Sequence, residues 1–308
     1  MFTVKRLDAA GSARYAMLTF SYARPLLERL DDPGNCFAVG AEWTEDDGQS
    51  AAAGLLVVRG SDDGGEAEVV SLFVVAKFRR RGIATVMLRH AEDLLRERRC
   101  PKLGLVYYSG KTATPAVEAL LHREGWSAPS VEGKVYQTDA RISAASWVRK
   151  TGMPGGMETF FWHELREEEK VRLRRLEGHQ YPAFLSPFKP NLPPEESNSL
   201  GLRLGGVTVG WCITSRIAAD TVLYDSVYVT PALRLSGCAF MLVAQSISLQ
   251  LERRIPRAIF AVNRQSEEMG SMLDRWLAPY ATGVSERKMA YKDLSAAGGG
   301  RNGGTESE

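Results

Sequence analysis

The sequence has few of the residues from which metal sites and disulfide frameworks are built. Its 308 residues include only four cysteines and four histidines. The cysteines (Cys36, Cys100, Cys212 and Cys238) form no C-x-x-C pair, and the histidines show no H-E-x-x-H spacing. Zinc sites, redox dithiols and small disulfide-rich folds depend on such spacings. We therefore expect no metal site and no disulfide scaffold.

The chain also lacks a strong charge of either sign and any long hydrophobic run. Its formal net charge is +2, whereas nucleic-acid-binding domains usually carry a pronounced basic surface. No stretch approaches the ~18 consecutive apolar residues of a membrane span, and the first residues contain no apolar signal-peptide core. These absences predict a cytoplasmic protein with no membrane span and no nucleic-acid partner, and they leave its oligomeric state open.

What the sequence does contain is enough apolar material for two hydrophobic cores. Hydrophobic residues make up 44% and charged residues 25%, as in globular proteins, and the length suits about two domains. A β-branched run over Glu68–Val75 predicts a buried strand, and the amphipathic pattern of Ala84–Arg98 predicts a helix. Strand and helix patterns alternate in this way along the chain. The predicted fold class is α+β (mixed α/β), a mixed central sheet flanked by helices.

One short pattern, R-x-x-G-x-A, occurs twice, at Arg79–Ala84 and at Arg234–Ala239. The second copy lies 155 positions after the first, and the predicted opening strands Phe2–Leu7 and Met157–Trp162 share this offset. A chance copy of a six-residue pattern would not keep the flanking elements in register. We therefore predict a duplicated domain: a first domain over 1–150, a second over 151–295, and a Gly-rich disordered tail over 296–308.

The repeated turn has the chemistry of a phosphate cradle. A strand that enters a tight glycine turn and then a helix presents free backbone N–H groups at the helix N-terminus, where the helix dipole also favours an anion. Glycine allows a left-handed backbone and close approach of the phosphate, and arginines add charge-assisted contacts. The pattern is neither G-x-G-x-x-G nor a P-loop.

Two stretches around the turn resemble motif A of the GNAT superfamily of N-acetyltransferases. Leu72 to Ala84 has the letters LFVVAKFRRRGIA, and Val227 to Ala239 has the letters VYVTPALRLSGCA. Both are similar to L-Y-V-x-P-x-x-[RQ]-x-x-G-x-[GA], and the second keeps the proline. The order of strands and helices resembles this family over nearly the whole chain except the tail. The resemblance implies two tandem GNAT-like domains.

The resemblance also implies where an acyl-CoA cosubstrate, acetyl-CoA or another, is held. Such domains bind it in a V-shaped gap between two splayed parallel strands, with strand backbone on the pantetheine arm and turn amides on the pyrophosphate. The implied residues of the first copy are Leu72, Phe73, Val74, Arg79, Arg80, Arg81, Gly82, Ile83, Ala84 and Thr85. Those of the second copy are Val227, Tyr228, Val229, Arg234, Leu235, Ser236, Gly237, Cys238, Ala239 and Phe240.

Amine acylation needs a base for the nucleophile and an acid for the departing thiolate. Glu68 lies where some GNAT members place their general base; the alternative is a solvated glutamate at a strand edge. Many members place the acid, a tyrosine, four residues before a G-F pair, but this chain has Leu121 there. Tyr108 is our candidate acid, while Tyr107 and His122 are alternatives that also suit structural roles.

The two halves differ around the shared turn. The second half has Leu223 at the position matched to Glu68, with Asp225 nearby. We therefore expect the first half to catalyse and the second to bind CoA without turnover or to shape the acceptor site; catalysis by both halves is the alternative. The aromatic, Pro-rich loop from Tyr181 to Pro190 either lines an acyl or peptide pocket or packs between domains.

These features together predict an acyl-CoA-dependent N-acyltransferase. The expected reaction moves an acyl group, acetyl or longer, to a primary amine of a small molecule or peptide by direct attack on the thioester. One alternative is a fatty-acyl transferase that modifies a peptide side-chain amine. Another is a CoA-binding sensor or scaffold without turnover.

Overall fold

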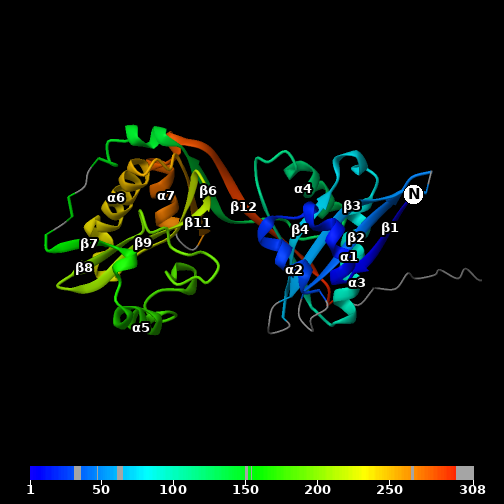
Figure 1. Cartoon of the computed structure of the whole chain (residues 1–308), viewed down its shortest axis with the longest axis horizontal. Helices are drawn as coiled ribbons and strands as arrows, with labels where there is room; N and C mark the ends of the chain where they lie inside the picture. Colours follow the sequence, from blue (N-terminus) through cyan, green and yellow to red (C-terminus); the bar gives the residue numbers. More distant parts are fainter. Residues whose placement is uncertain are drawn as a thin grey trace, which may run out of the picture. The chain divides into compact units, whose positions relative to one another are not determined.

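The computed structural model describes residues 1–30, 36–46, 48–60, 65–149, 152–153, 155–264 and 267–295 (Figure 1). The tail predicted over 296–308 lies outside these residues. The chain forms two compact units. The first unit is Met1–Val131 together with the segment that begins at Arg287, and the second unit is Glu132–Glu286.

The first unit begins with strand and helix elements in the predicted order. They are β1 (Phe2–Leu7), α1 (Ala9–Ser12), η1 (Ala13–Leu18), η2 (Ser21–Ala23), α2 (Arg24–Glu28), β2 (Cys36–Thr44), β3 (Ser50–Gly60), β4 (Ala67–Val74), η3 (Ala76–Phe78), α3 (Ile83–Glu97), β5 (Lys102–Tyr108) and α4 (Thr114–Arg123). The helical region before β2 is broken into short turns, and Pro25 occupies the first turn of α2, where a missing N–H is tolerated.

The remainder of the chain repeats this order. Its elements are β6 (Ser130–Thr138), η4 (Ala140–Ala144), β7 (Met157–Phe161), α5 (Glu167–Leu176), η6 (Ala183–Leu185), β8 (Leu200–Leu204), β9 (Val207–Ala218), β10 (Thr221–Val229), η7 (Pro231–Ser236), α6 (Cys238–Glu252), β11 (Arg257–Asn263), α7 (Glu267–Trp276) and β12 (Ala281–Asp293). In the described part of the chain, no helix has the length and apolar character that crossing a membrane requires.

The two units match at the 155-position offset found in the sequence. Helices α3 and α6 begin at Ile83 and Cys238, and both are preceded by a glycine in the left-handed region, Gly82 with φ 80° and Gly237 with φ 78°. Each helix is also followed by an arginine with positive φ, Arg99 at 58° and Arg254 at 57°. The duplication is therefore visible in backbone conformation as well as in the letters.

In each unit the sheet carries helices on both faces. Strands β1, β2, β3 and β4 of the first unit pair antiparallel in that order, and β4 pairs parallel with β5. The larger core lies between this sheet and α3, which buries Ile83, Met87, Leu88, Ala91 and Leu95 at helical spacing. In the second unit, α6 and α7 lie on one face of the sheet and α5 lies on the other (Figure 1).

In each unit, the strand that pairs with the second parallel strand comes from the other half of the sequence. In the first unit, β5 pairs antiparallel with β12 from Arg287–Tyr108 to Asp293–Lys102. In the second unit, β11 pairs antiparallel with β6 from Ala258–Thr138 to Asn263–Gly133. The spatial division therefore differs from the linear boundary expected between residues 150 and 151. The physical reason for this difference is that β5 and β11 each need a hydrogen-bonded partner on the edge that faces away from β4 or β10. Each of these two strands pairs with a segment that is distant in the sequence.

Side-chain packing anchors the exchanged segments. Tyr136 of β6 donates a hydrogen bond from its hydroxyl to Asp274 Oδ1 on α7 at 2.7 Å, and Lys134 Nζ lies 2.6 Å from Asp274 Oδ2. Burial and the bond to Asp274 raise the pKa of Tyr136. Trp147 joins the same core and donates from Nε1 to the Trp276 carbonyl at 3.3 Å. In the first unit, Ala290 of β12 is fully buried in the core.

Introducing a charged residue into β12 therefore tests whether this strand completes the sheet of the first unit. We expect Ala290→Asp to destabilise the first unit by about 3 kcal/mol or more, because it buries an unpaired carboxylate. Hydrogen exchange measured by mass spectrometry should speed up in the β5 peptide Lys102–Tyr108. Val284→Asp, at an exposed position of the same strand, should leave that peptide unchanged. Equal protection of the β5 peptide in both variants would contradict the exchange.

Candidate active site

The parallel strands at the centre of each unit pair for only a few residues and then part. In the first unit the β4–β5 register runs from Ala67–Leu103 to Val69–Leu105, although β4 continues to Val74 and β5 to Tyr108. In the second unit the β10–β11 register runs from Thr221–Arg257 to Tyr224–Phe260. Backbone groups on the facing edges past these points are left for another partner. This is the splayed geometry that the sequence resemblance implies.

A β-bulge marks the residue at which each pair of strands separates. In β4 the register with β3 shifts between Val69 and Ser71, so Val70 is the extra residue. In β10 the register with β9 shifts between Tyr224 and Ser226, so Asp225 is the extra residue. Bulges bend a strand and increase its twist, which opens the gap. Val70 and Asp225 are equivalent positions, and each lies at the apex of its gap.

At the open end of the first gap, the chain turns into α3 through Gly82. A Cβ on Gly82 would meet no atom within 4 Å, and its φ of 80° is a conformation that favours glycine. No side chain caps the α3 N-terminus, so the first N–H groups of the helix are directed at open space. The turn therefore fits an anion such as a pyrophosphate.

Four cations surround this turn, and three of them come from the predicted residues. The Arg79 side chain donates from Nε to the Val74 carbonyl at 3.0 Å, and the Arg81 guanidinium lies 4.6 Å from the Trp43 ring centroid. Arg80, with φ 66°, forms the tight part of the turn. The fourth cation, Arg123 of α4, donates to Thr85 Oγ1 in the first turn of α3. Arg123 was not among the predicted residues.

The second turn has the same backbone but a weaker phosphate cradle. Arg234 is its one arginine, and Leu235 is fully exposed beside it. Ser236 Oγ accepts a bond from the Cys238 N–H at 3.3 Å, which uses a donor that the first turn leaves free. Phe240 packs its ring against Trp147 at 4.8 Å and Trp276 at 5.2 Å. The predicted Phe240 side chain is therefore part of the core.

The strand residues predicted to line the two gaps lie on the edges that separate. Leu72, Phe73 and Val74 follow the bulge in β4, and Val227, Tyr228 and Val229 follow it in β10. Their side chains alternate between the two faces, as in any strand. Leu72 and Val74 pack on the α3 side, whereas Phe73 is exposed. Val227 and Val229 pack on the α6 side, whereas Tyr228 faces α5.

The face of the first gap opposite to α3 holds a carboxylate and two tyrosine hydroxyls. Glu68 pairs with Arg59, with 3.1 Å between Oε2 and Nη2, and both side chains are largely exposed. Tyr22 of η2 lies close enough to Glu68 and Tyr108 for their charges to act on it. Tyr22 is 69% exposed. Desolvation of its hydroxyl nevertheless raises the pKa of Tyr22, and the charges of Glu68 and Tyr108 raise this pKa further. The positive charge of Arg59 acts in the opposite direction.

The other candidate acids lie away from this group. Tyr107 points to the opposite face of β5, where its hydroxyl contacts Glu118 Oε1 at 3.2 Å, and burial with this carboxylate raises the pKa of Tyr107 to about 12. Leu121 is buried in the core, and His122 is exposed near the end of α4. Of the candidate residues, Glu68 and Tyr108 are the two whose charges both act on Tyr22.

In the second unit the same side of the sheet is filled by the chain itself. Aromatic side chains from β7, η5 (Trp162–Glu164), β9, β10 and the Pro-rich loop form one buried cluster, which includes Phe160, Trp162, Tyr181, Trp211 and Tyr228. The loop is held down by the Leu185 carbonyl, which accepts from Ser226 Oγ at 2.6 Å and from Trp211 Nε1 at 3.2 Å. The loop therefore packs within the second unit, over the place that is open in the first.

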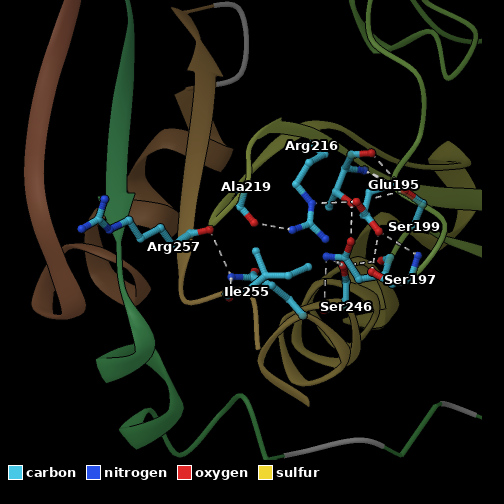
Figure 2. A network of polar contacts seen from close by, with 11 residues as sticks. Glu195, Ser197, Ser199, Arg216, Ala219, Ser246, Ile255 and Arg257 are labelled. Atoms are coloured by element: carbon cyan, nitrogen blue, oxygen red, sulfur yellow. Dashed lines mark hydrogen bonds and ion pairs between the residues drawn. The ribbon is translucent and has the colours of Figure 1, made fainter. Parts of the chain in front are cut away.

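A buried polar network holds the closed ends of β9, β10 and α6 together. Ser246 donates from Oγ to the Asn198 carbonyl at 2.6 Å, and Arg216 Nε pairs with Glu195 at 2.8 Å (Figure 2). Tyr224 is the last residue of β10 before the gap, and its hydroxyl donates a hydrogen bond to Gln250 Oε1 on α6 at 3.0 Å. Burial raises the pKa of Tyr224, so it remains a neutral donor. The apex of the second gap is therefore rigidly held.

Comparisons with known proteins agree with this geometry. Residues 8–120, within the first unit, match the Acetyltransferase (GNAT) family. A tandem GNAT protein from the clavulanic acid biosynthesis pathway superposes with a TM-score of 0.71 at 13% identity, covering 97% of this chain and 100% of that one. A GCN5-related N-acetyltransferase from Sphaerobacter thermophilus superposes with a TM-score of 0.62 at 17% identity, covering 95% and 96%. No curated protein matches the sequence.

The fold and the doubled turn are thus those of GNAT proteins. Residues 8–120 match the GNAT acetyltransferase family, and the whole chain has the fold of tandem GNAT proteins. The tandem arrangement and the α+β class expected from the sequence are confirmed.

Two residues of this site escaped prediction because their roles depend on distant contacts. Tyr22 lies in a short 3₁₀ turn before α2, and nothing in its local pattern links it to Glu68. Arg123 lies at the end of α4, 38 positions after Thr85. The structure leaves the apolar side chains of Met17, Phe20 and Tyr22 exposed in this region, which no local sequence pattern shows.

The closed face of the second unit should be sensitive to acid through Glu169 of α5. Its carboxylate receives bonds from Thr208 Oγ1 at 2.7 Å, Arg203 Nη2 at 2.8 Å and Arg166 Nε at 3.1 Å. Burial opposes ionisation, but these bonds outweigh it and lower the pKa of Glu169 from 4.5 to about 2. Because the pKa is depressed by folding, the stabilisation is complete above pH 4.5 and is lost as the pH falls towards 2.

We therefore expect Glu169→Gln to lower the free energy of unfolding by on the order of 2 kcal/mol at neutral pH and to flatten the loss of stability in acid. Urea unfolding at neutral and acidic pH measures both effects. Glu167→Gln is the matched control, because Glu167 is exposed on the same helix turn and pairs with Lys170 alone among the described contacts. The expectation fails if both variants show the acid dependence of the natural sequence.

Proposed function

We propose that the first unit transfers an acyl group, acetyl in the simplest case, from acyl-CoA to a primary amine of a small molecule or peptide. The observation that carries the proposal is the combination of a splayed strand pair, an uncapped glycine turn and an open face with Glu68 and Tyr108. The second unit shares the splayed strand pair, but Ser236 Oγ bonds the Cys238 N–H of its turn and its face is closed. The family match over residues 8–120 supports acyl transfer as the reaction.

The residues of the first unit fit an acyl-CoA. Free N–H groups at the start of α3 and the guanidinium groups of Arg80, Arg81 and Arg123 supply donors and positive charge for the pyrophosphate. The unpaired edge of β4 past Val70 supplies backbone groups for the amides of the pantetheine arm. Bound in this way, acyl-CoA supplies an activated thioester carbonyl at the apex of the gap.

Glu68 and Tyr108 have the chemistry that attack on a thioester requires. The Glu68 carboxylate takes a proton from the incoming ammonium, directly or through water, which frees the amine lone pair. Arg59 Nη2 lies 3.1 Å from Oε2 of this carboxylate and helps to hold it in place. The Tyr108 hydroxyl donates a proton to the departing thiolate, and its position on the face of β5 opposite to Tyr107 puts it on the acceptor side.

The open face also indicates which class of amine it would accept. Phe20 and Tyr22 stack with ring centroids 5.4 Å apart and planes within 4°. Together they present a flat apolar surface next to a carboxylate. An amine that carries an aromatic or other apolar group matches both features, because its cation meets Glu68 while its apolar part covers the rings.

Binding of acetyl-CoA is the first test. We expect native mass spectrometry to show bound acetyl-CoA, and Gly82→Val to weaken binding at the first unit at least tenfold. A β-branched residue at φ 80° is strained by about 1–3 kcal/mol and its methyl groups crowd the phosphate. Gly48→Val is the matched control, since Gly48 has φ 82° and equally open surroundings in the β2–β3 turn. No binding by the natural sequence would contradict the proposal.

Turnover tests the two catalytic roles. With a panel of amines that includes arylalkylamines, we expect Glu68→Gln and Tyr108→Phe each to lower kcat/KM for CoA release by about 10²-fold or more. Glu66→Gln is the control for the first, because Glu66 forms a similar exposed ion pair with Lys102. Tyr107→Phe is the control for the second. Full turnover by Glu68→Gln would remove Glu68 from the mechanism.

A further inference from the structure

The second unit contains an amine of its own at the apex of its gap. Lys189, in the Pro-rich loop, places Nζ 2.8 Å from Asp225 Oδ2. Asp225 is the bulged residue, the first one past the last β10–β11 pair at Tyr224–Phe260. The Lys189 side chain is 26% exposed and the Asp225 side chain 12% exposed. An amine and a carboxylate are thus held together where the two strands part.

The direction of the gap shows what would meet this amine. The phosphate turn at Gly237 lies beyond Val229, at the open end of the gap, and Asp225 lies four positions before Val229, at the apex. At about 3.3 Å per residue these strand positions are ~13 Å apart. An extended acyl-CoA arm that starts at the turn therefore brings its thioester towards Asp225 and Lys189.

The side chains around the apex of the second gap leave room for Lys189 and block the approach of an amine from solvent. The cluster around Tyr181, Trp211 and Tyr228 covers the face on which an external acceptor would enter. Bonds from Ser226 and Trp211 to the Leu185 carbonyl hold the loop four residues before Lys189. In the first unit the residue equivalent to Asp225 is Val70, and the face carries no such loop across the described residues. The second unit has therefore exchanged an open acceptor site for an internal amine.

We propose that Lys189 is the acceptor of the second unit and is acylated by the acyl-CoA that this unit binds. The inference rests on the proposed function, because it requires acyl-CoA in the second gap. Lys189 Nζ gives up a proton to Asp225 and attacks the thioester carbonyl carbon, so that an N–C bond forms and the C–S bond breaks. Of the two protons that the ammonium loses, one ends on the CoA thiolate and one passes to solvent. No other reactant is needed.

Acylation changes the loop as well as the lysine. An amide at Lys189 carries no positive charge, so the ion pair with Asp225 is lost and the Asp225 carboxylate is left half-buried without its partner. The segment around η6 then retains the Leu185 and aromatic contacts and the bond from Ser186 Oγ to Glu177 Oε2. The modification thus couples acyl-CoA supply to the packing of the loop on the second unit.

Peptide mapping of the full chain after incubation with acetyl-CoA tests the proposal, with Lys170 as an internal reference. Lys170 is 29% exposed and lies 2.6 Å from Glu167 Oε1, so spontaneous acylation should treat it much like Lys189. We expect at least tenfold more acetylation at Lys189 than at Lys170. Equal modification of both lysines, or none at Lys189, overturns the proposal.

Substituting the carboxylate that pairs with each lysine gives a second test. A catalytic and a purely structural Asp225 predict opposite changes in the acylation of Lys189. If Asp225 only held the lysine as a cation, Asp225→Asn would free Lys189 and raise its spontaneous acylation. We expect the reverse, a tenfold or greater fall at Lys189 with Lys170 unchanged. Glu167→Gln is the matched control and should leave Lys189 unchanged. A rise at Lys189 in Asp225→Asn overturns the proposal.

Hydrogen exchange provides a readout that does not depend on rates of acylation. Exchange in the peptide that spans Ala183–Lys189 should be faster in the acetylated chain than in the unmodified chain, and Lys189→Gln should show the same increase without acetyl-CoA. Unchanged protection in Lys189→Gln overturns the coupling to the loop. If acetyl-CoA binds and the first unit turns over while Lys189 stays unmodified, this inference fails and the proposed function stands. If no acetyl-CoA binds, both fail.

Discussion

The early separation of two parallel strands is the constraint on which the rest of this structure depends. Backbone donors and acceptors on the facing edges of β4 and β5, or of β10 and β11, have no partner in the sheet once the strands part. A bulge at Val70 or Asp225 causes the separation, and the glycine turn at Gly82 or Gly237 lies where the gap opens. A ligand with amides along its length and phosphates at its end meets all of these groups together. The cosubstrate is thus specified by the backbone, which explains why the duplication preserved it.

The two units use this shared backbone differently, and the difference lies in what covers the acceptor face. In the first unit short helical turns leave Tyr22, Glu68 and Tyr108 accessible. In the second unit a Pro-rich loop and a cluster of aromatic rings fill the same space and bring Lys189 to Asp225. Burial of large aromatic side chains stabilises that loop strongly, so the closed face is a stable arrangement. This difference in packing is the basis for proposing an external amine as the acceptor of the first unit and Lys189 as the acceptor of the second.

Exchange of β6 and β12 makes the two units depend on one another for folding. Strand β12 completes the first sheet and β6 completes the second, so neither half of the sequence contains all the strands of one unit. Buried contacts such as those of Ala290, and of Tyr136 with Asp274, fix the exchanged strands in place. The parallel strands β5 and β11 would otherwise present an unpaired edge, which is costly and prone to aggregation. A chain cut near residue 150 would lose a strand from each unit.

The sequence by itself determined that the chain has two α+β domains of one kind. The evidence was the periodicity of apolar residues, the doubled turn and the constant offset between its two copies. Such local patterns of apolar residues and glycines specify strands, helices and tight turns. Strand bounds such as Phe2–Leu7 and Thr221–Val229, and the left-handed glycines, were within reach of this reasoning. Only the tertiary structure decided which half donates the edge strand of each sheet, which tyrosine approaches Glu68, and that Lys189 meets Asp225. These depend on contacts between residues far apart in the chain, and no local pattern encodes which distant segments come together. The turn that the sequence shows twice therefore identifies the fold and its cosubstrate, while the differing acceptor faces are set by packing.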